Sequence, residues 1–349
     1  MKASSVSSTA ISQALRYSMM RTQTALVTAQ KEVATGRVAD AGLALGARTA
    51  QSVSFARDIE RLDGIVDSNA LVSARLTATQ TALGQMSSAA QDFLSTLTAS
   101  VSGDAAPSVT LASANATLDA LTSILNTSLN GEYLFAGINT DIKPINSFTD
   151  AASPAKAAFD AAFLAHFGFT QMSPAAASVS AADMDSFLTS TLEPHFMGAA
   201  WQPAWSNATD QTIVSRIALN ETTETSVSAN NDGVRRLMMA TATIQDMFSS
   251  NLSTAGKQQL IERAVAMVGG AIGELADLQS RTGIVQKRVA DASDRIEMQS
   301  DLFERHVMGM EGVDPYEAST RVADLLAHIE TSYALTARIQ QLSLLRFLG

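Results

Sequence analysis

The four histidines, His166, His195, His306 and His328, are the residues best suited to proton transfer or metal binding. None of them has the spacing of a metal-binding motif such as HExxH. A catalytic histidine also needs an orienting partner and a nucleophile, and no such set is visible in the sequence. His166 and His195 lie in the apolar stretches "LAHFGF" and "EPHFM". The sequence therefore favours structural histidines with satisfied hydrogen bonds, and it predicts neither a metal nor a cofactor.

Two other patterns could suggest chemistry. "GGAIGEL" places Gly269 and Gly273 four residues apart, but no predicted strand precedes it and its spacing fits no phosphate-binding loop. Such spacing favours close approach of two helices, with a simply tolerated pair of glycines as the alternative. Carboxylates from Asp291 to Asp301 share their predicted helix with lysines and arginines, which indicates a solvated or subunit-facing helix. The chain is not expected to be an enzyme.

Composition excludes several classes of protein. The 349 residues carry a net charge of −10, which disfavours nucleic-acid binding because phosphate recognition needs a dense basic face. Cysteine is absent, which excludes disulfides and thiol chemistry. No apolar run reaches the 18 residues of a membrane-spanning helix, and the hydroxyl-rich N-terminus does not resemble a cleavable signal peptide.

Proline placement predicts how the chain is organised. Five of the seven prolines lie between residues 144 and 203, whereas 1–106 and 204–314 contain no proline. Of the two tryptophans, Trp201 lies in this proline-rich segment and Trp205 closely follows it. Long proline-free flanks permit long helices. We therefore predict a mainly α fold, in which N- and C-terminal arms form a long antiparallel helical rod or bundle with a small inserted α+β domain. The predicted parts are an N-terminal helix at 1–35, an arm at 36–135, the insert at 136–229, an arm at 230–312 and a C-terminal helix at 313–349.

Hydrophobic periodicity places the elements within these parts. Heptad spacing predicts helices over about 8–35 and 54–102 and along the C-terminal arm, where it runs from Ile261 to Met310. Gly36 is placed to end the first helix, and Asp314 with Pro315 is placed to begin the last one. Within the insert we expect short helices at 154–167 and 180–192, strands in "QTIVSRIALNETTETSVSA", and a turn at "ANNDG" that starts the return arm.

Both ends of the chain carry apolar residues that need a covering surface. The first helix could pair with the last, but a pair of helices leaves much of each broad stripe exposed to water. Burying a leucine is worth about 1.5–3 kcal/mol, so exposed ones favour association. We expect neighbouring copies to cover these residues; a C-terminal helix docked on its own domain is the alternative. The predicted assembly residues are Ile11, Leu15, Met19, Leu26, Leu325, Ile329, Tyr333, Leu335, Ile339, Leu342, Leu345 and Leu348.

Three stretches resemble the flagellin superfamily. Thr35–Met86 is similar to its N-terminal helix–turn–helix segment, and "NGEYLFAG" resembles the Tyr-x-Phe-Ala-Gly stretch of hook–filament junction proteins. Val313–Leu348 is similar to the flagellin-type C-terminal end. Within the superfamily the chain is most like the hook-associated protein 3 family. The stretch "GRVADAGLALG" departs from the pattern that true flagellins have in the corresponding loop, which makes a flagellin the less favoured interpretation.

The resemblance implies a structural adaptor of the bacterial flagellum, forming a homo-oligomeric ring between a neighbouring hook-associated protein and the flagellin filament. It further implies export through the flagellar type III apparatus without a cleaved signal, with an export chaperone on the C-terminal helices. From the charge and hydropathy described above, we expect no membrane or nucleic-acid partner. Two alternatives stay open: a flagellin that forms the filament itself, and a secreted effector or enzyme whose activity lies in the insert.

Overall fold

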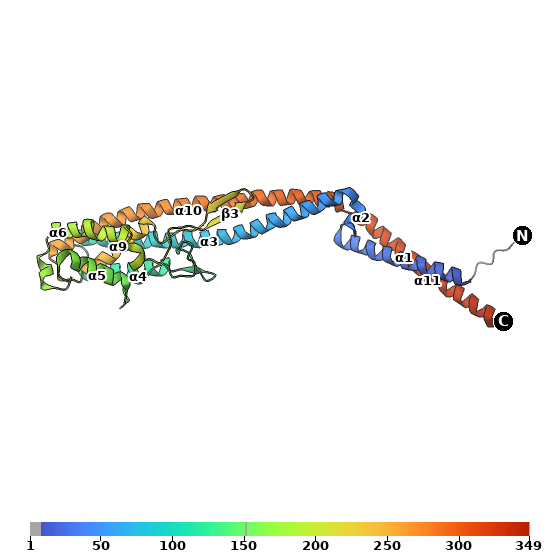
Figure 1. The fold of residues 1–349 in the computed structure, drawn as a ribbon, viewed down its shortest axis with the longest axis horizontal. Helices are drawn as coiled ribbons and strands as arrows, with labels where there is room; N and C mark the ends of the chain where they lie inside the picture. Colours follow the sequence, from blue (N-terminus) through green and yellow to red (C-terminus); the bar gives the residue numbers. More distant parts are fainter. Residues whose placement is uncertain (1–7, 151, 349) are drawn as a thin grey trace. The chain divides into compact units, whose positions relative to one another are not determined.

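The computed structural model describes residues 8–150 and 152–348, except for the side chains of residues 8, 9, 11, 12, 203 and 339–348. The chain divides into two compact units. The first unit joins the N-terminal residues up to Gly64 with the C-terminal residues from Ile296 onward, and the second unit comprises Ile65–Arg295. Two long helices, α3 (Thr49–Val101) and α10 (Thr254–Glu311), contribute to both units. The fold is mainly α, as predicted (Figure 1).

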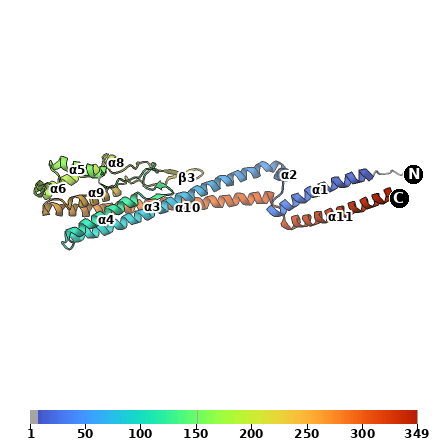
Figure 2. The same cartoon turned by 90° about the horizontal axis from the view of Figure 1, so that it is seen from below.

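In the first unit, the N-terminal and C-terminal helices pack side by side and run antiparallel (Figures 1 and 2). These helices are α1 (Ser8–Thr35) and α11 (Pro315–Leu348), and both match their predicted positions. Gly36 follows α1 with a left-handed backbone, and the Asp314 carboxylate accepts the N–H of Tyr316 at 2.8 Å at the start of α11. The short helix α2 (Ala41–Leu45) and a 3-10 turn at Gly46–Arg48 connect α1 to α3.

The second unit packs short elements against the inner parts of α3 and α10. Its remaining helices, strands and turns, in chain order, are α4 (Pro107–Leu125), β1 (Ser128–Leu129), β2 (Glu132–Tyr133), α5 (Pro154–Phe167), η2 (Pro174–Ser178), α6 (Ala181–Ser186), η3 (Phe187–Leu192), α7 (Glu193–Met197), α8 (Trp201–Ala204), β3 (Val214–Ala218), β4 (Glu221–Glu224) and α9 (Asp232–Met247). The predicted helix at 154–167 is confirmed. The one at 180–192 is confirmed as α6 continued by a π-helical turn, and the predicted strands form the antiparallel hairpin β3–β4.

One hydrophobic core runs through this second unit. Buried residues of α3, α4, α9 and α10 contact the buried aromatics of the inserted segment, so these aromatics do not form a separate core. Trp201 and Trp205 stack with ring centroids 5.8 Å apart, and Phe148 stacks on Trp205. The five-part division proposed from the sequence stays a prediction. In the structure, the insert belongs to the same compact unit as the helices that flank it.

The segment predicted as the return arm contains two helices. The sequence predicts one arm over 230–312, but the structure divides this segment into α9 and α10, with residues 248–253 between them. All residues from Leu237 to Ile244 are buried, so this part of α9 is covered on every side. The helix contacts α4, α7 of the insert and α10. A helix buried all round belongs to a core and not to the surface of an extended arm.

The "NGEYLFAG" stretch has a structural explanation. Asn130 and Gly131 form the turn between β1 and β2, while Leu134, Phe135 and Ala136 are buried in the core. Gly137 has φ +69°, and a Cβ at this position would collide with Thr209 and approach the carbonyl oxygen of Gln211 to 2.8 Å. Only glycine fits both the backbone conformation and this space.

Close approach of two helices occurs at a glycine other than the predicted ones. Gly269 and Gly273 are exposed, and a Cβ on either would meet no atom within 4 Å, so the predicted packing at "GGAIGEL" is wrong within this chain. Gly233 in α9 instead lies against α10, where a Cβ would come within 2.9 Å of Glu274 Cβ and 3.2 Å of the Leu275 nitrogen. Gly233, the last residue of the "ANNDG" turn signal, is therefore the glycine that allows α9 and α10 to approach closely.

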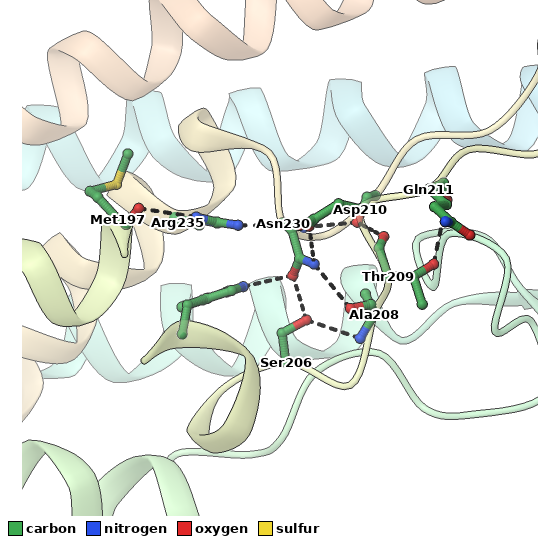
Figure 3. A network of polar contacts seen from close by, with 10 residues as sticks. Met197, Ser206, Ala208, Thr209, Asp210, Gln211, Asn230 and Arg235 are labelled. Carbon is green, nitrogen blue, oxygen red and sulfur yellow. Dashed lines mark hydrogen bonds and ion pairs between the residues drawn. The ribbon is translucent and has the colours of Figure 1, made fainter. Parts of the chain in front are cut away.

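A buried amide fixes the insert to the start of α9 (Figure 3). The Asn230 side-chain oxygen accepts hydrogen bonds from Trp201 Nε1 at 2.7 Å and from the Ser206 hydroxyl at 2.6 Å. Its Nδ2 donates to the Ala208 carbonyl at 3.0 Å and to the Asp210 carboxylate at 2.7 Å. One side chain thus satisfies both of its donors and both acceptor positions, and it joins α8, the loop after it and α9.

Candidate assembly surface

The pairing of α1 with α11 buries small residues and leaves large apolar ones partly open. Ala29 and Ala318 are fully buried, which lets the two helices approach closely. The larger predicted assembly residues are less well covered. Tyr333 is 52% exposed and Leu335 is 49% exposed. The others whose side chains are described have intermediate exposure: Leu15, Met19, Leu26, Leu325 and Ile329. A two-helix pair covers one side of each helix only, so incomplete burial is the expected result.

Five of the predicted assembly residues lie outside the described side chains. They are Ile11, Ile339, Leu342, Leu345 and Leu348.

Exposed apolar residues concentrate in the first unit. Among the described residues, thirteen of the twenty-two exposed large hydrophobic side chains belong to this unit, although it holds about a third of the chain. They lie on α1, α11, the connection between α1 and α3, and the adjoining turns of α3 and α10. Scattered single apolar residues are normal on a protein surface, whereas concentration in one part marks an interaction site.

A groove runs between α1 and α11 on this surface. It encloses about 630 Å³ and is lined by apolar, hydroxyl and charged side chains. Its lining residues are Tyr17, Met20, Arg21, Thr24, Ala25, Thr28, Ala29, Glu32, Arg321 and Leu325. The mixture of apolar width and a few fixed charges suits a protein surface better than a small apolar ligand.

Charged pairs fix the two helices in register. Glu32 of α1 is buried, and its carboxylate meets the Arg321 guanidinium at 3.1 Å. Arg321 also contacts Glu317 one turn earlier at 2.8 Å. Farther along the pair, Gln23 Nε2 donates to the Tyr333 hydroxyl at 3.1 Å. The buried Glu32 carboxylate needs Arg321, since burying an unpaired charge costs several kcal/mol.

The segment that follows α1 and the segment that precedes α11 pair through an isolated antiparallel β-bridge between Arg37 and Gly312. The Val38 N–H donates to the Glu311 carbonyl at 2.8 Å, and the Val313 N–H donates to the Gly36 carbonyl at 3.0 Å. The Ser52 hydroxyl donates to the Glu311 carboxylate, which also lies 3.6 Å from Arg37. These contacts hold both helices of the pair to the ends of α3 and α10 within the first unit.

Of the four histidines, His166 and His195 make the hydrogen bonds expected of structural residues, whereas His306 and His328 are exposed. His166 Nδ1 lies 2.7 Å from the Thr191 hydroxyl, and His195 Nδ1 lies 2.7 Å from the Thr191 carbonyl oxygen. His306 stacks on Phe55 at 5.5 Å. Across the described part of the chain, no three His, Asp or Glu side chains come together in a way that could hold a metal ion. In that same part, every helix is too short or too polar to cross a membrane.

A carboxylate–lysine cluster in the second unit has perturbed pKa values. The Asp246 carboxylate is buried, and this burial raises its pKa although Lys156 Nζ lies 2.9 Å away. The carboxylates of Asp160 and Asp246 in turn raise the pKa of Lys156 against the opposing effect of its own desolvation. Gln171 donates to both carboxylates, at 2.9 and 3.1 Å. This cluster joins α5 to α9 and is part of the packing.

Sequence reasoning missed the outward-facing residues of the surface. The heptad phase that includes Leu15, Met19 and Leu26 identifies the half-buried face of α1, but Tyr17 and Met20 lie off this phase and are exposed. Large apolar residues off the buried phase of an amphipathic helix are themselves a signal of a second contact surface. No sequence pattern predicts the ion pair between Glu32 and Arg321, because 289 positions separate the two residues.

Family comparisons match both ends of the chain. The model described as the bacterial flagellin N-terminal helical region matches residues 6–140, and the bacterial flagellin C-terminal helical region matches residues 265–348. Together the two matches cover well over half of the chain. No curated protein sequence matches it.

Two solved structures share the fold at low sequence identity. A protein from Vibrio parahaemolyticus, assigned as a flagellar hook-associated protein, aligns with a TM-score of 0.52 and 9% identity, over 75% of this chain and 96% of its own. Flagellar hook-associated protein 3 from Legionella pneumophila aligns with a TM-score of 0.51 and 8% identity, over 73% of this chain and 98% of its own.

Proposed function

Because this chain belongs to the bacterial flagellin family, as the matches at both of its ends establish, we propose that it is a structural adaptor at the hook–filament junction of the flagellum. In this role it forms a ring that joins the first junction protein to the flagellin filament. The chain is a structural component and carries out no catalysis.

The observation that carries the proposal is the concentration of exposed apolar side chains on the first unit. Both family matches include helices of this unit. The α1–α11 pair buries mainly small residues and leaves its larger apolar residues half covered, so it needs further contacts. Neighbouring copies in a ring, the adjoining hook-associated protein and flagellin supply these contacts. The predicted residues from Leu15 to Leu335, and those with undescribed side chains, take part in them.

Two further partners follow from the same surface. Before assembly, the exposed apolar side chains need protection from aggregation, so an export chaperone holds the C-terminal helix α11 in the cytoplasm. The chain then leaves the cell through the flagellar type III apparatus without removal of a signal peptide, and it functions outside the cell.

The filament subunit itself is the second candidate function, and it is favoured by the fact that the matching family models describe flagellin ends. Growth in solution separates the two. An adaptor should stop at monomers or small rings when the purified protein is concentrated, whereas a flagellin grows filaments many micrometres long in electron micrographs.

A deletion strain tests the adaptor role directly. Cells that lack this chain should retain hooks, secrete unassembled flagellin and lose swimming motility, with wild-type behaviour restored by a plasmid copy. Filaments of normal length and number on the deletion strain would refute the proposal.

A further inference from the structure

Among the described residues, three of the four exposed methionines lie in the first unit. In the second unit Met86, Met184, Met238 and Met247 are fully buried in the core. In the first unit Met20 is 61% exposed, Met298 62% and Met308 48%. Among the described residues, the remaining exposed methionine is Met172 in the second unit, which is 65% exposed.

The three exposed methionines of the first unit lie among its other exposed apolar residues. Met20 lines the groove between α1 and α11 beside Tyr17 and Leu325. Met298 and Met308 lie on α10, on either side of the exposed Leu302. A thioether is flexible and polarisable, so it adapts to partner surfaces of irregular shape. Its sulfur is also the most readily oxidised atom of a chain that contains no cysteine.

We propose that Met20, Met298 and Met308 are three oxidation-sensitive positions of the first unit, and that their oxidation by hydrogen peroxide before assembly prevents the chain from assembling. This inference rests on the proposed function, since it assigns these three residues to the surface that neighbouring molecules cover.

The reaction requires only peroxide. A lone pair of the thioether sulfur attacks one peroxide oxygen, an S–O bond forms and the O–O bond breaks. The other oxygen leaves as water after a proton transfer. Sulfur is oxidised by two electrons to the sulfoxide and peroxide is reduced. The product is a polar side chain with a strong acceptor oxygen, and methionine sulfoxide reductases reverse the change.

Sulfoxide formation opposes association because the new oxygen must be buried without a donor that was placed to meet it. A penalty of this kind weakens an association equilibrium by about tenfold for each buried sulfoxide. The assembled state protects the same residues, since covered sulfur atoms are not accessible to peroxide. These positions are therefore sensitive only between export and assembly.

The first measurement requires no assembly. The purified full-length chain is treated with hydrogen peroxide, and sulfoxide is quantified at each methionine by peptide mass spectrometry over time. We expect Met20, Met298, Met308 and Met172 to react at least tenfold faster than the five buried core methionines, which are Met86, Met184, Met238, Met239 and Met247. Equal rates at all positions would overturn the proposal, whether or not the adaptor function holds.

The second measurement uses substitution variants. The triple variant M20L/M298L/M308L keeps apolar side chains of similar volume, and M172L is the matched control. Incorporation of purified chain is scored on isolated hooks that lack it. Peroxide should reduce incorporation of the wild-type and M172L chains at least tenfold, and it should leave the triple variant within twofold of its untreated level.

Equal incorporation of treated and untreated wild-type chain, with all three residues fully oxidised, would refute the assembly part of the proposal. So would loss of incorporation by the treated triple variant. If the untreated wild-type chain also fails to incorporate, the adaptor function is contradicted, and the assembly part of this proposal is refuted with it. The oxidation rates measured by mass spectrometry still test whether the three methionines are reactive.

Discussion

Replacing Asn230 with leucine should destabilise the second unit more than almost any other polar substitution. Asn230, Trp201 and Ser206 are all buried, and the Asn230 amide makes four hydrogen bonds (Figure 3). Leucine has a similar volume, so it removes all four bonds and leaves no room for a replacement water. Its branched end would also face the polar atoms that now surround the amide.

The magnitude follows from the groups left without partners. The Trp201 indole N–H and the Ser206 hydroxyl lose their acceptor in a buried site, and the Ala208 carbonyl loses a donor. Each buried unsatisfied group costs about 1–3 kcal/mol. The Asp210 carboxylate is exposed and regains water, so it adds little. The free energy of unfolding should therefore fall by about 3–5 kcal/mol.

Tryptophan fluorescence is the assay, because Trp201 and Trp205 are the two tryptophans of the chain and both lie beside this amide. Urea unfolding followed by fluorescence reports the stability of the site itself. The matched control is Asn207→Leu, an exposed asparagine whose Nδ2 donates to the Lys143 carbonyl and the Asn146 side chain. It should cost less than about 1 kcal/mol. A loss below about 1 kcal/mol for Asn230→Leu would refute the reasoning.

Three further predictions follow from the packing. Gly233→Ala should lower the free energy of unfolding by about 1–3 kcal/mol, because the added Cβ would collide with α10. Gly269→Ala adds a Cβ in open space and should raise the free energy of unfolding by about 0.5–1 kcal/mol. Equal effects of the two variants in thermal unfolding would refute the close approach of α9 and α10 at Gly233. Lys156→Met leaves the buried Asp246 carboxylate without its cation, and because Lys156 is partly exposed the cost should be only about 1–2 kcal/mol at pH 8. Burial raises the pKa of Asp246 in the folded state, so its contribution favours folding below the ordinary value of 3.8 and is lost as pH rises through the raised pKa. Asp246→Asn should remove this fall in stability in pH-dependent urea unfolding, and an unchanged pH profile would contradict it. Glu32→Gln should weaken the α1–α11 pair by about 1–2 kcal/mol and speed amide exchange in α11, and unchanged exchange would argue against the role of its pairing with Arg321.

Local signals in the sequence predict where most helices begin and end. Gly36 and Asp314 lie at the ends of α1 and α11 as expected, because a left-handed glycine and an N-terminal carboxylate are short-range requirements. Heptad spacing likewise predicts α3 and α10, since these helices bury one face. Residues that act within a single turn of helix can be identified without knowledge of their distant neighbours.

The remaining features depend on contacts between distant residues. The break between α9 and α10 is one of them, because the connection between the two helices bonds to distant carbonyl groups: Asn251 Nδ2 donates to Met172 and the Ser253 hydroxyl donates to Val179. The amide of Asn230 bonds to residues 20–29 positions earlier, and each of them is ordinary in the sequence. The partial exposure of the α1–α11 pair could be anticipated from the apolar ends of the chain. The exposed positions of Met20 and Tyr17 required the structure.

The central claim is that other molecules cover the exposed apolar residues of the first unit. It is tested most directly by electron microscopy of flagella in cells whose single copy carries V27D and L335D, changes at exposed positions of α1 and α11. The control is L71D on α3 of the second unit, since Leu71 is 68% exposed and Val27 is 65% exposed. We predict hooks without filaments for the double variant and normal filaments for the control. Normal filaments on cells with the double variant would contradict the account.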